Sequence, residues 1–171
     1  MAGIPTYAVT DTETGGLHPR ANALTQISII VVDDQFNELE TFAHRVIPRP
    51  GYTVEPRAAE INGYNEAEWL QTGMDWQHAD RAYDSFLQQW FRDRPCIGVA
   101  HNASFDAKFL QHHTPSAYAR YLQWDPTNPE RAADDGWYCT MKAMKEWRAR
   151  CKYAGANKLS DLAGVAGYTV E

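Results

Sequence analysis

The sequence is poor in cysteine and has no long apolar run. Its three cysteines, Cys96, Cys139 and Cys151, form no Cys-x-x-Cys pair and have no histidine at zinc-ligand spacing, so we expect reduced thiols. The longest apolar stretches, such as Ile27 to Val32, are too short to span a bilayer. Met1 to Tyr7 lacks the charged and apolar segments of a secretory signal. These absences predict a cytoplasmic protein with no membrane partner.

Positive charge is also scarce. The formal net charge of −6 argues against the broad basic surface with which proteins grip duplex nucleic acid. If the substrate is a polyanion, something other than general basicity must hold it. The 171 residues, 44 % of them hydrophobic, are enough for one substantial core, so we expect a single domain over residues 1–171.

The first part of the chain predicts three consecutive strands and the rest alternates between helices and short strands. The strands, rich in β-branched and alternating residues, are Thr6 to Thr12, Leu24 to Asp33, Leu39 to Ile47, Cys96 to Asn102 and Gly136 to Thr140. Apolar residues at helical spacing predict helices over Arg57 to Asn62, Glu66 to Gln71, Ala79 to Arg94, Ser104 to His113, Met141 to Arg150 and from near Ser160. Residues 118–135 are expected to form a surface insertion. The order predicts an α/β fold in which a mixed five-stranded sheet, an antiparallel meander followed by two parallel strands, has helices on both faces.

Two carboxylates stand at the end of the first predicted strand, in "TYAVTDTETGG". Residues i and i+2 of a strand point to the same side, so Asp11 and Glu13 can converge on one point above the sheet. Such a pair repels itself unless a cation lies between the two groups. Mg²⁺ or Mn²⁺ takes oxygen ligands and often completes its shell with substrate phosphates. A metal could therefore hold a polyanion that this acidic chain does not attract. The same acidic pair is also common as a merely solvated strand end.

A third carboxylate, Asp106, lies in "VAHNASFDAKFL", on the first turn of the helix that follows the fourth strand. A carboxylate is electrostatically favoured near a helix N-terminus, which is one explanation for its place. If the fourth strand lies parallel to the first and beside it, Asp106 instead faces Asp11 and Glu13 across one edge of the sheet. Ligands of open α/β sheets bind at such edges.

The segments "DTETGGL" and "HNASFD" together resemble the first and second exonuclease motifs of the DEDD superfamily of 3′-to-5′ exonucleases. This superfamily includes the proofreading exonucleases of bacterial DNA polymerase III and ribonuclease T. The likeness extends to "AAEINGYN", "CTMKAMK" and "NKLSDLAGVAGY", and so covers nearly the whole chain. Its overall pattern is similar to the histidine subtype, DEDDh.

The resemblance implies a ribonuclease-H-like fold and hydrolysis of nucleic acid from its 3′ end with two Mg²⁺ or Mn²⁺ ions. By that match Asp11 bridges both metals, Glu13 binds one, and Asp106 holds the second directly or through water. The implied products are nucleoside 5′-monophosphates from single-stranded or frayed DNA or RNA, and a polymerase or another nucleic-acid-processing protein is the implied partner. Which of DNA or RNA is cut, and in which oligomeric state, does not follow from these motifs.

The resemblance also implies a set of substrate contacts. They are Thr12, Thr14, Gly15, Gly16, Leu17, Ile61, His101, Asn102 and Phe105. The two glycines would let backbone amides approach the terminal nucleotide closely. A plain turn between two strands explains either glycine equally well.

The apolar members of this set have two explanations each. Leu17, Ile61 and Phe105 match positions where the family places side chains against the terminal bases, and such contacts read a single strand without regard to sequence. Core packing is the alternative for all three. His101 and Asn102 are likewise divided between substrate contact and support of the strand-to-helix junction.

The family's third motif, His-x-x-x-x-Asp, supplies a general base and a fourth metal ligand, and we expect it after "LSDLAGVAGYTVE". None of the six histidines matches that position, and Asp161 comes too early, so the expected last helix is not in this sequence. Either the sequence is a shortened form of an active enzyme, or it is a naturally inert relative, or a partner supplies the residues. The alternative function is therefore an inert module of the same fold that binds nucleic acid or a protein partner. His44, His78, His112 and His113 are expected to be structural or exposed.

Overall fold

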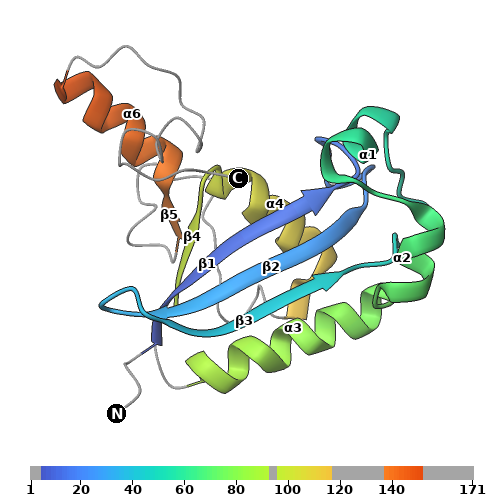
Figure 1. Cartoon of the computed structure of the whole chain (residues 1–171), viewed down its shortest axis with the longest axis horizontal. Coiled ribbons are helices and arrows are strands. Elements are labelled where there is room, and N and C mark those ends of the chain that lie inside the picture. The colour runs from blue at the N-terminus through green and yellow to red at the C-terminus, as the bar shows by residue number, and fades with distance from the viewer. Residues whose placement is uncertain (1–4, 93–95, 117–136, 152–171) are drawn as a thin grey trace.

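A computed structural model describes residues 5–92, 96–116 and 137–151, which form a five-stranded sheet in the order β3-β2-β1-β4-β5 (Figure 1). The strands are β1 (Pro5–Thr14), β2 (Leu24–Asp33), β3 (Glu38–Arg45), β4 (Ile97–Ala100) and β5 (Trp137–Cys139). The helices are α1 (Pro56–Asn62), α2 (Glu66–Thr72), α3 (Trp76–Phe91), α4 (Ala103–His113) and α6 (Thr140–Cys151). The first three strands are antiparallel and the last two run parallel to β1, which confirms the predicted mixed sheet.

Each strand and helix predicted within the described residues is present, although several bounds differ by a few residues. Helix α3 begins at Trp76 because the side chain of Asp75 caps it, accepting hydrogen bonds from the amides of Gln77 and His78. It ends at Phe91 instead of Arg94. Strand β3 ends at Arg45, two residues before the predicted end. The predicted insertion at 118–135 and the helix from Ser160 lie outside the described residues.

The core lies on one face of the sheet. Ala8 and the alternate residues Ile27, Ile29 and Val31 of β2 are fully buried there, in one cluster with residues of α3 and α4. The helical members of the cluster include Tyr83, Leu87, Phe91, Phe109 and Leu110. Burying these side chains is the main stabilising contribution to the fold. Helices α3 and α4 thus cover this face of the sheet.

The opposite face of the sheet carries the acidic strand end. Val9 and Ile30, which are paired across β1 and β2, are 38 % and 36 % exposed, and Asp11 continues the same row. This face is therefore open to solvent, as far as the described residues extend. No helix among them is both long enough and apolar enough to cross a membrane.

Candidate active site at the end of strand β1

The last residues of β1 place acidic side chains on one face of the sheet and threonine hydroxyls on the other. Thr10, Thr12 and Thr14 point to the core side and are at most 8 % exposed. Asp11 and Glu13 alternate with them and so point to the open face, as the period of two requires. The structure thus places the two predicted carboxylates side by side on the solvent face of one strand.

Asp106 reaches this strand from α4. It lies in the first turn of the helix and is only 4 % exposed. Its Oδ1 accepts hydrogen bonds from the Thr12 amide at 3.1 Å and from the Thr12 hydroxyl at 2.8 Å. These bonds hold Asp106 against the strand position between Asp11 and Glu13, close enough for the charge of Asp11 to raise its pKa. The parallel pairing of β1 with β4 makes the contact possible.

Burial and mutual repulsion make the three carboxylates difficult to ionise. Burial raises the pKa of Asp11, although the Thr12 amide and His101 oppose the shift. The pKa of Glu13 is raised by burial and by the charge of Asp11. The pKa of Asp106 is raised to about 6 by burial and by Asp11, against the lowering effect of the Thr12 hydrogen bonds. A cation between these groups would relieve both costs.

The donors suit a hard divalent cation, since all three are carboxylates. Within residues 5–92, 96–116 and 137–151, no three His, Cys, Asp or Glu side chains lie close enough together to hold one metal ion. Asp11, Glu13 and Asp106 thus fit such a cation by chemistry and by electrostatic coupling.

The glycines after β1 are required by packing within the chain. A Cβ on Gly15 would overlap the Thr53 carbonyl and lie 2.9 Å from the Val54 Cα. A Cβ on Gly16 would come within 2.6 Å of the Asn22 side chain. The Gly15 amide donates to the Ala23 carbonyl at 2.7 Å, so this amide is not the group that approaches a nucleotide.

Two of the predicted apolar contacts are open to solvent. Leu17, on the loop after β1, is 73 % exposed, and Ile61, on α1, is 77 % exposed. Core packing is therefore wrong for both residues. Helix α1 is tied to the strand end because the Asn62 side chain donates to the Thr14 carbonyl at 3.0 Å. Phe105 differs, since it is partly buried against the core with its ring 4.9 Å from that of Phe109.

The remaining predicted contacts are largely engaged inside the protein. The hydroxyl of Thr14 donates to the Gly16 carbonyl at 2.8 Å, as that of Thr12 does to Asp106. Nδ1 of His101 is 3.1 Å from the Thr140 hydroxyl, and the His101 carbonyl accepts from the Met141 amide. The backbone carbonyl of Asn102 accepts from the Phe105 amide, whereas its side chain does not cap α4. His101 and Asn102 thus support the junction between β4 and α4, which is one of the two roles predicted for them.

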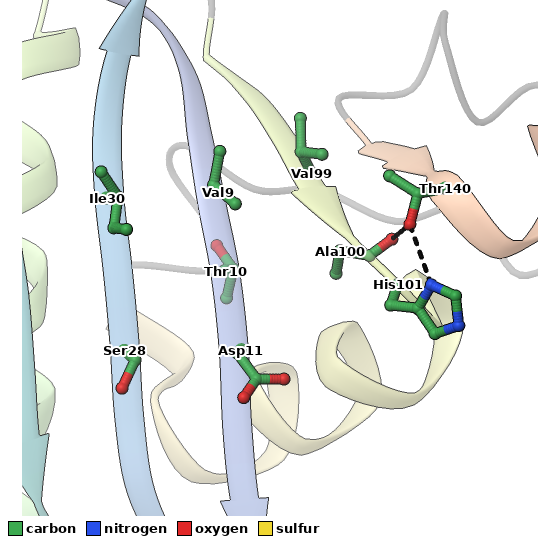
Figure 2. Close-up of a pocket in the computed structure, with 9 residues that line it drawn as sticks. All are labelled: Val9, Thr10, Asp11, Ser28, Ile30, Val99, Ala100, His101 and Thr140. Carbon is green, nitrogen blue, oxygen red and sulfur yellow. Dashed lines mark hydrogen bonds between the residues drawn. The ribbon is translucent and has the colours of Figure 1, made fainter. Parts of the chain in front are cut away.

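A pocket of about 330 Å³ opens beside Asp11 on the solvent face of the sheet (Figure 2). Its lining combines apolar residues of β1, β2 and β4 with polar residues of β1 and β2 and with His101 and Thr140. The lining residues are Val9, Thr10, Asp11, Ser28, Ile30, Val99, Ala100, His101 and Thr140. Figure 2 shows the His101 ring directed toward Thr140 at the edge of the pocket.

Asn22 is a central residue that the sequence did not indicate. It is 2 % exposed, and its Oδ1 accepts from the His18 amide at 2.9 Å. Its Nδ2 donates to Glu55 at 3.0 Å and to the Thr53 hydroxyl at 3.3 Å. These hydrogen bonds hold the loop that carries Leu17 in place, and we call them the Asn22 lock. An asparagine just before a buried strand was the available signal, and it does not distinguish such a lock from an ordinary turn.

The family model described as Exonuclease matches residues 8–166 of the chain. Ribonuclease T of Salmonella choleraesuis is 31 % identical over 128 residues, covering 71 % of this chain and 58 % of that protein. Ribonuclease T of Pectobacterium atrosepticum is 29 % identical over 109 residues, covering 60 % of this chain and 49 % of that protein. The chain spans about half the length of the curated relatives that it matches.

Solved structures of exonuclease I share the fold. The crystal structure of E. coli exonuclease I in complex with a dT13 oligonucleotide has a TM-score of 0.72 at 20 % identity, over 98 % of this chain and 37 % of that chain. An ExoI/SSB-Ct complex has a TM-score of 0.73 at 20 % identity, over 100 % of this chain and 38 % of that chain. These similarities agree with a ribonuclease-H-like sheet.

Proposed function

Because the chain belongs to the Exonuclease family, we propose that it hydrolyses phosphodiester bonds from the 3′ end of single-stranded or frayed nucleic acid and releases nucleoside 5′-monophosphates. The observation that carries the proposal is the pair of hydrogen bonds from Thr12 to Asp106. They join the first motif to the second at the carboxyl end of β1, where the charge of Asp11 also raises the pKa of Asp106. This is the edge at which open α/β sheets bind their ligands.

Divalent cations, Mg²⁺ or Mn²⁺, are the proposed cofactors, and two per site is the number we propose. Asp11 would contact both ions, Glu13 one, and Asp106 the other directly or through water. When bound, the ions would make a water nucleophilic and stabilise the leaving 3′ oxygen. The chain's own part is to hold the carboxylates: the Thr12 amide and hydroxyl favour the ionised form of Asp106 against its burial.

The exposed apolar side chains of Leu17 and Ile61 are the proposed contacts to the terminal nucleotides. Both lie on segments fastened to the end of β1, Leu17 through the Asn22 lock and Ile61 through the neighbouring Asn62. Apolar side chains gain contact with any base, so this arrangement suits a single strand of any sequence. The substrate proposal covers DNA and RNA alike, with a polymerase or another nucleic-acid-processing protein as partner.

The assay uses a 5′-labelled single strand with Mg²⁺ or Mn²⁺, and it is run on the 171-residue chain and on the full product of its gene. We expect a ladder of shortened strands that chelation abolishes. Asp11→Asn keeps the shape of the side chain and removes its charge, so it should remove the ladder. Asp34→Asn, in the exposed turn after β2, is the matched control and should keep it. An unchanged ladder with Asp11→Asn would refute the proposal.

The second candidate is an inert module of the same fold that binds nucleic acid or a protein partner. It is favoured because no three His, Cys, Asp or Glu side chains among the described residues are grouped so that they could hold one metal ion. An end-labelled strand that is retained by the full gene product with Mn²⁺ but never shortened would support this alternative.

A further inference from the structure

Three segments that are far apart in the sequence bring two arginines and a histidine to one place around Tyr52. His112, at the end of α4, has its Nε2 at 2.7 Å from the Tyr52 hydroxyl. The guanidinium of Arg49 lies over the Tyr52 ring at 5.6 Å from its centroid. Burial lowers the pKa of His112, and so do the charges of Arg49 and of Arg20, which follows Pro19 on the loop after β1. We call Arg20, Arg49 and His112 the basic cluster.

The charge of the basic cluster is not neutralised by the described part of the chain. Neither Arg20 nor Arg49 forms an ion pair there, whereas Arg45 pairs with Glu68 and Arg150 with Glu146. Two positive groups left together in a chain of net charge −6 form a local anion-attracting surface.

Nearby carboxylates are engaged elsewhere. Glu55 accepts a hydrogen bond from Asn22, and Asp75 accepts two from the first turn of α3. Arg49 also stacks on Trp76, with its Cζ 4.4 Å from a ring centroid. Cations interleaved with aromatic rings are typical of surfaces that bind single-stranded nucleic acid.

The basic cluster adjoins the proposed catalytic edge through one loop. Arg20 lies three residues after Leu17 on the loop between β1 and β2. Nε2 of His113 is 3.1 Å from the carbonyl oxygens of both Pro19 and Asn22. The Thr53 amide donates to the Ala21 carbonyl at 3.0 Å, which ties the same loop to the segment of Arg49 and Tyr52. The cluster and Leu17 thus share one fixed support.

We propose that the basic cluster binds backbone phosphates of the single strand on the 5′ side of the terminal nucleotide. The inference rests on the proposed function and adds a second contact region to it. Guanidinium groups suit this ligand because they meet phosphate oxygens with two parallel hydrogen bonds. The catalytic edge, which is acidic, holds only the terminal nucleotide, and the basic cluster holds the strand that follows it.

The test compares a dinucleotide with a single strand of about twelve nucleotides, a length in the range of single-strand binding sites. The variant is Arg20→Gln combined with Arg49→Gln, and kcat/KM is measured with Mg²⁺ at several salt concentrations. Each lost phosphate contact should lower kcat/KM for the long strand about fivefold at about 0.1 M salt and reduce the salt slope by about 0.7. Hydrolysis of the dinucleotide should not change.

The control for Arg20→Gln alone is Arg92→Gln. Arg92 is an exposed arginine after the far end of α3, and its replacement should not change kcat/KM for either substrate. Thermal unfolding checks that Arg49→Gln keeps the fold. An equal fall in kcat/KM for both substrates, or no fall for the long strand, would overturn the inference.

If the wild type cuts neither substrate, the proposed function fails and the basic cluster is tested by binding alone. The fluorescence anisotropy of a labelled strand of about twelve nucleotides is then measured without metal. Weaker binding by the double variant, with a smaller salt slope, supports the cluster. Equal binding by wild type and variant overturns it.

Discussion

Asp106 on α4 and Thr12 on β1, 94 residues apart in sequence, are joined by two hydrogen bonds to one carboxylate oxygen. Thr12 uses its amide and its hydroxyl together, so both the backbone position of β1 and the side chain of Asp106 are fixed. The contact places a buried carboxylate beside Asp11 and Glu13 and supplies the hydrogen bonds that such a group requires when it ionises.

The first prediction concerns the Thr12 hydroxyl. Thr12→Val removes this donor with little change of shape, and because the hydrogen bond lowers the pKa of Asp106, that pKa should rise further. The acid limb of kcat/KM should move to higher pH, with a larger loss near pH 6 than near pH 8. Unfolding free energy should fall by about 1.5 to 3 kcal/mol, the range for hydrogen bonds to charged groups.

Thr10→Val is the matched control for this change. Thr10 lies on the same strand and the same buried face, but its hydroxyl donates to the Ala8 carbonyl at 3.0 Å instead of a carboxylate. It should lose stability without a shift of the acid limb. An equal shift in both variants would show that Asp106 is not the group that titrates.

The second prediction concerns stability and pH in the absence of metal. The pKa of Asp106 is raised to about 6 from 3.8, so between these values the folded state holds a proton that the unfolded state has released. Its contribution is complete below pH 3.8 and is lost as the pH rises through about 6. Asp106→Asn should remove this contribution, which is up to about 3 kcal/mol at 1.4 kcal/mol per pKa unit.

The measurement is urea unfolding of wild type and Asp106→Asn in chelator, from about pH 4 to about pH 7.5. The difference between the two proteins should change in favour of the variant as the pH rises. Saturating Mg²⁺ should stabilise the wild type more at the upper end of this range, because a bound cation favours the ionised carboxylates. A pH-independent difference would contradict the raised pKa.

The strands and helices were predictable because their signals are local. Alternation in "LTQISIIVVD" gave β2 with its observed bounds, Leu24–Asp33, and the apolar spacing in "NASFDAKFL" gave α4. Which face of the sheet each helix covers depends on packing between segments that are distant in sequence, so local patterns do not predict it.

The carboxylates of the candidate site could be predicted from the sequence, but the residues that hold the neighbouring loops in place could not. Asp11 and Glu13 share a face by strand geometry alone, and the motif match added Asp106. The Asn22 lock and the cluster around Tyr52 depend on packing among segments that are distant in sequence, which no single segment reveals. The exposure of Leu17 and Ile61 was likewise a tertiary result, since apolar residues are more often buried.

The third prediction separates substrate contact from packing at Leu17 and Ile61. Because these side chains are 73 % and 77 % exposed, Leu17→Ala and Ile61→Ala should each change the unfolding free energy by no more than about 0.5 kcal/mol. If a nucleotide buries either side chain, the alanine variant should lose about 1 to 3 kcal/mol of binding, or about 5- to 150-fold in KM. Leu70→Ala, 61 % exposed on α2, is the control for a generic loss of surface. An unchanged KM in both variants would exclude the contact.

The fourth prediction concerns His113, which holds the Leu17 loop from the end of α4. Its Nε2 faces two carbonyl oxygens and must therefore carry a proton, and the pKa of the ring is lowered to about 4 by burial and by His112. The ring is neutral at neutral pH, and it stacks on Phe109 at 5.9 Å. His113→Phe keeps the aromatic contact and removes the donor, so the Asn22 carbonyl loses a buried partner. We expect a loss of about 1 to 3 kcal/mol in unfolding free energy.

Hydrogen exchange should locate that loss in the loop of residues 15–23, with faster exchange there than in β2. His113→Gln, which restores an N–H donor, should recover part of the protection, and His78→Phe on the exposed side of α3 should change nothing. Because the loop carries Leu17 while Asp106 is held by separate bonds to Thr12, His113→Phe should raise KM more than it lowers kcat. A fall in kcat alone would place His113 in support of the carboxylates instead of the loop.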